Sequence, residues 1–402
     1  MSKNQLTVLC ISSYEKGHDF MKECKVHGCR VVLLTSKSLE NAPWPKESID
    51  EIFYIPDKNK DWNMRDVIYG VSFLARNEQI DMIVALDDFD VERAAALREH
   101  LRIQGMGDTT ARYFRDKLAM RTRAAEAGIP VPEFLHILNY KKINEFTKNV
   151  PFPYMVKARM LAGAYGIKKV HNEQELWDRI NYLGDEQSFY LLERFVPGNI
   201  YHVDSIIYER EIKFACASKY GTPPFEVAHD GRVFTSMTLD KKTDEVKKIL
   251  ELNTELLDVL GIVRGVSHSE FIRDEKGKFY FLETSARVGG ANLSVLVEAA
   301  TGINLWREWA KIEILKGDGK YKLPEVKNSF SAIVTSLAKQ ETPDLSSYND
   351  PEVFWRLNKE YHAGIIVSSP NLNRTKELMD SYTQRFYNDF FATAKMGEKP
   401  TN

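Results

Sequence analysis

Short apolar runs alternate with helix-like segments over residues 6–100, and this alternation constrains the fold more than any other feature. Strands are predicted at 6–11, 30–35, 52–55 and 81–86. Helices are predicted at 16–27, 62–77 and 91–100. Helices that connect successive strands are typical of a parallel sheet. The pattern therefore predicts an α/β domain with a Rossmann-like parallel sheet.

Ligands of such a sheet lie beyond the carboxyl ends of its strands, so the loops there are informative. Two polar loops fall at that edge, residues 12–14 after the first strand and 87–90 after the fourth. No GxGxxG motif follows the first strand, which leaves a dinucleotide site unsupported. Acidic loops more often cap the next helix than bind a ligand, so we interpret 87–90 as an N-cap.

The composition is typical of a soluble globular protein, with 43% hydrophobic and 28% charged residues among 402. The 55 basic and 57 acidic side chains nearly balance, so we expect no nucleic-acid partner and no membrane-surface binding. The apolar runs are too short to span a bilayer, and the N-terminus shows no cleavable signal pattern. The four cysteines lack zinc-site spacing, which favours free thiols and a cytoplasmic location.

Two glutamates belong to a predicted hairpin. Glu270 and Glu283 stand at the outer ends of two apolar-rich runs, which a polar turn ending at Gly277 joins. A two-residue turn at 276–277 places the glutamates directly opposite each other, and a four-residue loop at 274–277 places them on a diagonal. Either register puts both carboxylates on one face, roughly 5–8 Å apart. Like charges this close repel unless a cation lies between them, so the hairpin predicts a divalent metal site.

A lysine lies beside a glycine-rich loop earlier in the chain. A strand over 153–159 contains Lys157, and the loop 161–166 leads back into a second strand at 167–170. Loops of this kind cover phosphates with backbone N–H groups, although a plain hairpin turn is an equal alternative.

A segment over 220–231 is expected to be a long structureless loop. Loops of that length are usually functional or disordered, and its aromatic and proline content argues against disorder. Packing or lid contacts would explain its side chains equally well. Candidate substrate contacts in this region, on the face of Glu270 and at the corner after the hairpin are Phe225, His229, Arg232, Thr235, His268, Gly289 and Gly290.

The motifs follow one another in a fixed order: 115–117, 154–157 with its glycine loop, 192–198, Glu270 and 283–290. In this order and spacing the chain resembles the ATP-grasp superfamily. Within it, the chain is most similar to carboxylate–amine ligases related to L-amino acid ligases and carbamoyl-phosphate-synthase-like proteins. The resemblance covers roughly residues 110–315.

The resemblance implies that ATP and Mg²⁺, with Mn²⁺ as an alternative, are the cofactors. Lys117 and Lys157 match the lysines that hold ATP phosphates. Arg287 matches the residue that meets the transferred phosphoryl group, and Lys157 is also expected to be catalytic. Glu270 and Glu283 match the metal ligands. Residues that match the phosphate lid and the adenine-binding strand are Gly163, Ala164, Gly166, Glu193, Arg194, Phe195 and Val196.

The chain departs from the family pattern at two positions. Ser285 stands where the family often has a metal-binding asparagine, and we retain it as a candidate metal ligand. Ile200 stands where many members have a glutamate for the ribose hydroxyls. His202 or Asp204 could replace that glutamate, and we expect His202 at the nucleotide.

The resemblance also implies a domain plan. We expect an N-terminal α/β domain over 1–108 and an α+β ATP-grasp domain over 109–318, with a mobile lid subdomain at about 130–192. A C-terminal α/β segment over 319–402 is expected to pack on the ATP-grasp core.

The expected function is that of an ADP-forming ligase that joins a small carboxylic acid, such as an amino acid, to an amine through an acyl phosphate. Two alternatives remain: a bicarbonate-activating carboxylase or carbamoyl-phosphate-type subunit, and a non-catalytic ATP-binding regulator. Small-molecule carboxylates and amines are the expected partners, and a homodimer is left open. We find no Ser-His-Asp or Cys-His system that would indicate nucleophilic catalysis.

Overall fold

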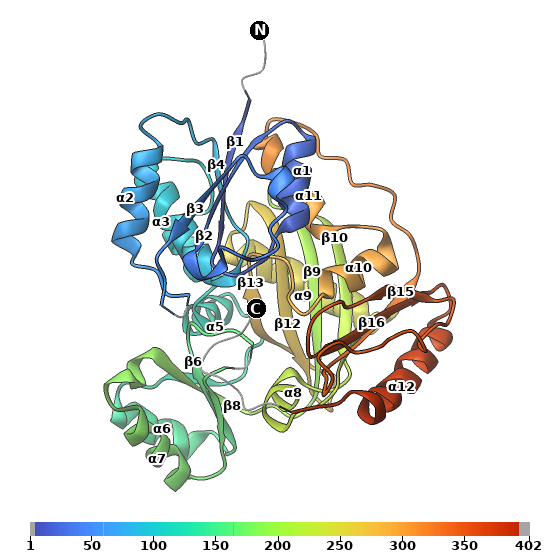
Figure 1. The fold of residues 1–402 in the computed structure, drawn as a ribbon. Coiled ribbons are helices and arrows are strands. Elements are labelled where there is room, and N and C mark those ends of the chain that lie inside the picture. Colours follow the sequence, from blue (N-terminus) through green and yellow to red (C-terminus); the bar gives the residue numbers. More distant parts are fainter. Residues whose placement is uncertain (1–4, 59, 164, 394–402) are drawn as a thin grey trace.

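The computed structural model describes residues 5–58, 60–163 and 165–393 (Figure 1). Their strands form three sheets, a parallel sheet of four strands and two antiparallel sheets of four and eight strands. The predicted mixed α/β class is therefore confirmed. No helix in these ranges is both long enough and apolar enough to cross a membrane.

The parallel sheet is built from the N-terminal part of the chain. Its strand order is β3 (Glu51–Ile55), β2 (Arg30–Ser36), β1 (Thr7–Ser12) and β4 (Met82–Ala85). The strands are apolar along most of their length because helices cover both faces. One face packs against α1 (His18–Val26), and the other against α2 (Met64–Leu74) and α3 (Val91–Leu101). The Rossmann-like arrangement predicted from alternation is confirmed.

The smaller antiparallel sheet lies in the region expected to be a lid, at the lower left of Figure 1. Its strand order is β5 (Phe134–His136), β8 (Tyr190–Arg194), β6 (Tyr154–Ala158) and β7 (Ile167–Val170). Two helices, α6 (Tyr140–Asn149) and α7 (Glu173–Leu183), contribute to its apolar core. This sheet therefore has a core of its own, while its mobility stays a prediction.

The eight-stranded sheet forms the centre of the molecule. Its order is β13 (Phe279–Ser285), β12 (Arg264–Arg273), β9 (Asn199–Tyr208), β10 (Glu211–Tyr220), β11 (Phe234–Thr238), β14 (Phe330–Leu337), β16 (His362–Ser369) and β15 (Val353–Arg356). The C-terminal strands thus extend this sheet directly, through the pairing of β11 with β14. The expected domain boundaries at 108 and 318 stay predictions.

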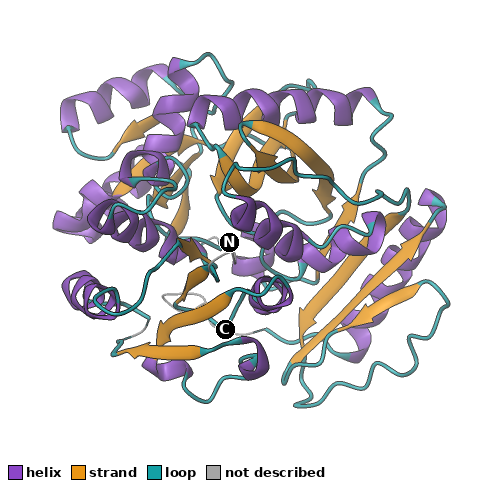
Figure 2. Ribbon diagram, turned by 90° about the horizontal axis from the view of Figure 1, so that it is seen from above, coloured by secondary structure: helices purple, strands orange, loops and turns teal. Residues whose placement is uncertain are grey.

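Helices cover the eight-stranded sheet on both sides (Figure 2). One face of β9, β10, β12 and β13 packs against α5 (Lys117–Glu126) and α9 (Asp244–Leu260). On the opposite face, α11 (Leu305–Leu315) joins a core shared with α1 and the parallel sheet. The C-terminal strands are covered by α10 (Leu293–Thr301) and α12 (Leu372–Asp389).

One local expectation is wrong. The segment expected to be structureless contains α8 (Pro224–Asp230), which begins with a proline at a position where a missing N–H costs nothing. Helices α4 (Asp108–Arg112) and α5 are separated by a break at residues 113–116. The break occurs because Asp116 is extended and its side chain accepts a hydrogen bond from the Leu118 N–H, which starts a new helix.

Phe271 tests the core between the sheet and its helices, since it is fully buried beside Phe281 with ring centroids 6.0 Å apart. Phe271→Ala should cost about 3–5 kcal/mol of unfolding free energy, because the cavity left behind can collapse only in part. Phe189→Ala, at a ring that is 57% exposed, is the matched control and should cost about 0.5 kcal/mol or less. Thermal unfolding midpoints of the two variants would test this, and equal midpoints would contradict it.

Candidate active site

A cavity of about 570 Å³ lies between the small antiparallel sheet and the eight-stranded sheet. Strands β6 and β8 contribute to one wall, and β12 and β13 to another. The start of α5, helix α8 and the segment after β13 complete it. The two carboxylates expected to bind metal, the two lysines expected to bind phosphate and Arg287 all line this cavity.

The hairpin brings the two glutamates together as expected. Glu270 pairs directly with Glu283 across β12 and β13. The Tyr220 hydroxyl donates to Glu270 Oε1 over 2.8 Å, and Lys117 Nζ lies 2.8 Å from Glu283 Oε2. Burial alone would raise the pKa of Glu283, but the Lys117 ammonium outweighs it and holds that pKa below its usual range.

The register of this hairpin differs from both alternatives predicted from the sequence. Near the turn, Phe271 pairs with Phe281, and a bulge then shifts the pairing so that Glu270 meets Glu283. The extra residue is Leu282, and both Leu282 and Glu283 line the cavity. The bulge therefore keeps Glu283 on the face of Glu270 even though the turn has a register that neither alternative contained.

Lys117 reaches the cavity because α5 begins there. It is the first residue of α5, it is almost completely buried, and its Nζ also donates to the Leu161 carbonyl over 2.6 Å. Leu161 belongs to the loop that follows β6, so the lysine links the glycine-rich loop to Glu283. An ammonium group in this position offsets the charge of Glu283, one of the two facing carboxylates.

Glu193 is buried on β8 and is held by two cations. Lys157 forms a short ion pair with its Oε1, and Arg121 Nε lies 2.7 Å from its Oε2. Burial raises the pKa of this carboxyl, but Arg121 and Lys157 more than offset that effect and lower the pKa below its usual range. Glu193 lines the cavity together with Arg194, Phe195 and Val196, the segment expected at the adenine edge.

Asp88 lines the cavity, although the loop 87–90 was expected to act as an N-cap. Asp87 caps the short turn 88–90, where its side chain accepts from the Phe89 N–H, but the helix that follows, α3, has no side-chain cap among the described residues. The neighbouring Asp88 lines the cavity instead, in a short ion pair with Arg115 and with its Oδ1 3.8 Å from Arg287 Nε. Burial raises the pKa of Asp88, but the two arginines outweigh it, and the carboxyl stays ionised.

A buried histidine–aspartate network lies next to Glu270, one of the two carboxylates expected to bind metal. His202 and His268 each donate through Nδ1 to a different oxygen of Asp204, at 2.9 Å in both cases. His268 Nε2 lies 3.6 Å from Glu270 Oε1. Burial lowers the pKa of His268, but Asp204 reverses this and raises it to about 9. His268 therefore carries a positive charge near neutral pH.

The other predicted contacts divide into those that line the cavity and those that do not. Phe225, His268 and Gly290 line it, as do Gly163 and Ser285. Residues absent from its lining are Gly166, His202, His229, Arg232, Thr235 and Gly289. His202 is fully buried with both ring nitrogens engaged inside the protein, so its position gives no support to a ribose contact. Ala164 lies outside the described residues.

Sequence comparison agrees with this geometry. Residues 122–291 match the ATP-grasp domain family. The chain contains an ATP-grasp domain. This confirms the resemblance drawn from the order of the motifs. The matched range includes Lys157, Glu193, Glu270, Glu283 and Arg287.

Individual relatives share the ATP-grasp domain at low identity. The L-arginine-specific L-amino acid ligase of Bacillus subtilis is 27% identical over 242 residues, which cover 59% of this chain and 58% of that protein. The L-amino acid ligase structure from Bacillus licheniformis has a TM-score of 0.77 at 17% identity and covers 97% of this chain and 98% of that one. An N5-carboxyaminoimidazole synthetase from Staphylococcus aureus, complexed with ADP, has a TM-score of 0.72 at 16% identity, with 95% and 99% covered. The structural likenesses show a shared fold.

Arg121 tests how the ATP-grasp domain holds a buried carboxylate. Arg121→Met should destabilise the protein by about 3–5 kcal/mol, because the buried Glu193 loses one of its two cations. Arg123→Met changes an exposed arginine on the same helix and should cost about 0.5 kcal/mol or less. Thermal unfolding midpoints would compare them. An Arg121 variant as stable as the Arg123 variant would refute the buried-pair interpretation.

Asp204→Asn tests the histidine network. The pKa of His268 should fall well below the value of about 9 given by the intact network, because the negative partner is gone. The stability that the raised pKa confers is complete below about pH 6.5 and is lost as pH rises through about 9, so the variant should lose more stability at pH 6 than at pH 9.5. NMR titration of the imidazole carbons and unfolding midpoints at both pH values measure this. An unchanged His268 pKa would count against the network.

Proposed function

We propose that this protein is an ATP-dependent, ADP-forming ligase that joins a small carboxylic acid to an amine through an acyl phosphate. One observation carries the proposal: Glu270 and Glu283 face each other in a cavity that also holds Lys117, Lys157 and Arg287. Two carboxylates with three cations are what phosphoryl transfer needs, since this chemistry depends on positioning and charge neutralisation.

The donor set fits Mg²⁺. Glu270 and Glu283 offer carboxylate oxygens, and Ser285 offers a hydroxyl on the same wall. Asp88 adds a buried Oδ1 that has no hydrogen-bond partner among the described residues. Hard divalent cations prefer such oxygen ligands, and Mg²⁺ when bound would neutralise charge on the phosphates. Mn²⁺ has the same preference for oxygen.

The reaction would proceed in two displacements. A carboxylate oxygen of the acid attacks the γ-phosphorus of ATP, the bond from that phosphorus to the β,γ-bridging oxygen breaks, and ADP leaves. The amine nitrogen then attacks the acyl carbon, the acyl–oxygen bond to phosphate breaks, and the nitrogen loses a proton. ADP, phosphate and an amide are the products.

The proposed roles of the cations follow from where their side chains emerge. Lys117 and Lys157 come from two neighbouring elements, α5 and β6, and would neutralise the ATP phosphates together. Arg287, in the segment after β13, would meet the transferred phosphoryl group beside the acid. The loop after β6 would exclude water from the acyl phosphate, which water would otherwise hydrolyse.

Amino acids are the proposed acids and amines. Two relatives are named as L-amino acid ligases, one of them L-arginine-specific, and this supports amino-acid substrates without fixing which ones. The related synthetase complexed with ADP supports a nucleotide in the same fold.

Product release tests the reaction class. ADP and phosphate release should be measured with Mg-ATP and pools of amino acids, other carboxylates and amines, with bicarbonate as the comparison substrate. Release that requires an organic acid and an amine together is the expected result. Turnover with bicarbonate alone would contradict the ligase proposal, as would ATP binding without turnover in every pool.

Glu283→Gln tests the metal site. Removing one negative ligand should lower kcat at least about 100-fold while leaving the fold intact, because the charge that holds the cation is lost. Glu275→Gln, in the exposed turn of the same hairpin, is the matched control and should retain wild-type turnover. Steady-state rates at saturating Mg²⁺, with circular dichroism to check folding, measure both. A Glu283 variant with the wild-type rate would refute the metal-site assignment.

A further inference from the structure

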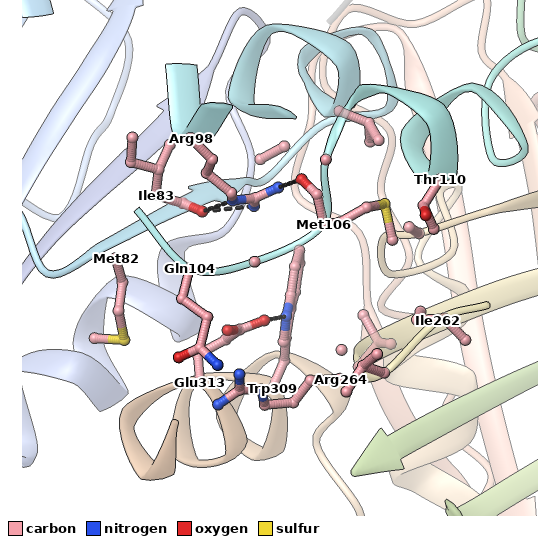
Figure 3. Close-up of a pocket in the computed structure, with 18 of the residues that line it drawn as sticks. Met82, Ile83, Arg98, Gln104, Met106, Thr110, Ile262, Arg264, Trp309 and Glu313 are labelled. Carbon is pink, nitrogen blue, oxygen red and sulfur yellow. Dashed lines mark hydrogen bonds between the residues drawn. The ribbon is translucent and has the colours of Figure 1, made fainter. Parts of the chain in front are cut away.

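A second cavity, of about 370 Å³, lies where the parallel sheet meets the ATP-grasp domain (Figure 3). We call it the seam cavity. Its lining comes from β4, α3 and the loop 104–107 on one side, and from residues 261–266 and α11 on the other. We call the cavity of about 570 Å³ in the candidate active site the ATP-grasp cavity. No described residue lines both cavities. The volume of the seam cavity lies in the range of about 300–1,000 Å³ that is typical of small-molecule sites.

The charged groups of the seam cavity are mainly basic. Four cationic residues line it, Arg98, Arg210, Arg264 and Lys316, against two carboxylates, Asp81 and Glu313. An excess of positive charge inside a concave, partly buried site favours an anionic ligand.

Internal pairing removes part of this excess, since Arg264 Nε lies 3.6 Å from Glu209 Oε1. Lys316 Nζ lies 3.4 Å from Asp81 Oδ1, which neutralises both groups. The guanidinium of Arg98 donates only to the carbonyls of Ile83 and Met106 among the described residues, and Glu313 is the carboxylate that acts on its charge. Arg210 has no ion-pair partner among the described residues.

The remaining wall suits a flat apolar body. The indole of Trp309 stands in the cavity wall, fixed because its Nε1 donates to Glu313 Oε1 over 2.9 Å. Met82, Met106 and Ile262 supply apolar surface around it (Figure 3). A planar group can stack on an indole, while its acidic group meets a guanidinium.

Three backbone segments separate the two cavities. Ala286 lines the seam cavity, while its neighbours Ser285 and Arg287 line the ATP-grasp cavity. In the second segment, Ala85 and Val91 line the seam cavity, and Asp88, which lies between them in the chain, lines the ATP-grasp cavity. The third segment carries Thr110 toward the seam and Arg115 toward the ATP-grasp cavity.

These segments present the Asp88–Arg115–Arg287 ion-pair group to the ATP-grasp cavity. We propose that the seam cavity binds a small organic anion with a planar apolar body and that its occupancy changes nucleotide affinity through these three segments. Binding to one cavity must then alter binding to the other by the same factor, because coupling between sites is reciprocal.

Benzoate and phenyl phosphate are suitable probes, with benzamide as the neutral isostere of benzoate. Binding should be measured by ligand-observed NMR on the full chain with Mg-ADP saturating, so that the ATP-grasp cavity does not compete for the probes. Saturable binding of at least one anion, and at least about tenfold weaker binding of benzamide, is expected because the amide lacks the charge. A preference for one of the two probes would distinguish a carboxylate ligand from a phosphate ligand.

Variants connect the binding to this cavity. Arg264→Gln and Arg210→Gln should each weaken binding of that anion about tenfold, since each removes one charge-assisted contact. Arg210 is exposed, so its variant remains informative if Arg264→Gln does not fold. Arg307→Gln, at an exposed arginine of α11 outside the lining, is the matched control and should bind normally.

Calorimetric titration of Mg-ADP, with and without a saturating amount of the anionic probe that binds, tests the coupling. The Kd of Mg-ADP is expected to change at least about fivefold. Three results would overturn the proposal: no saturable binding of either anion, binding that neither cavity variant weakens, or an unchanged Kd for Mg-ADP. None of these results depends on ligase turnover, so the proposed function stands or falls separately.

Discussion

The site depends on one constraint: a carboxylate that is fully or partly shielded from water must lie next to a cation. Glu193, Glu283 and Asp88 are each held by cationic side chains that come from other parts of the chain. Burial acts against ionisation at all three positions, and in each case the neighbouring cations reverse its effect on the pKa. These pairs join the small sheet, α5, the parallel sheet and the hairpin, so the same contacts that neutralise the acids also hold the cavity together. A nucleotide with its metal would enter a set of charges that is already arranged.

The architecture explains how so many charges reach one place. Strands β12 and β13 carry Glu270 and Glu283 on one face, and a bulge at Leu282 keeps Glu283 on that face. The opposite face of the same strands is packed with aromatic and aliphatic side chains against α5 and α9. A rigid, well-packed sheet is a suitable support for groups that must hold their positions during phosphoryl transfer.

The parallel sheet and the facing carboxylates were predictable from the sequence because both rest on local patterns. Alternating strand and helix patterns gave the parallel sheet, and the two glutamates of one hairpin gave the facing carboxylates. Contacts between distant residues were not predictable: Arg121 and Glu193 are 72 positions apart. Asp87 and Asp88 show the same difficulty at short range, since one caps a turn and the other enters the cavity, and only the backbone direction distinguishes them. The bulge was missed because a single extra residue leaves no compositional signal.

We propose that Glu270 and Glu283 hold a divalent cation that binds together with ATP. Calorimetric titration of the wild-type protein with ATP, in Mg²⁺ and again in excess chelator, tests it most directly. ATP should bind at least about tenfold more tightly with Mg²⁺, a difference of about 1.4 kcal/mol, because without the metal two facing carboxylates repel the phosphates. Equal ATP affinity under the two conditions would contradict it.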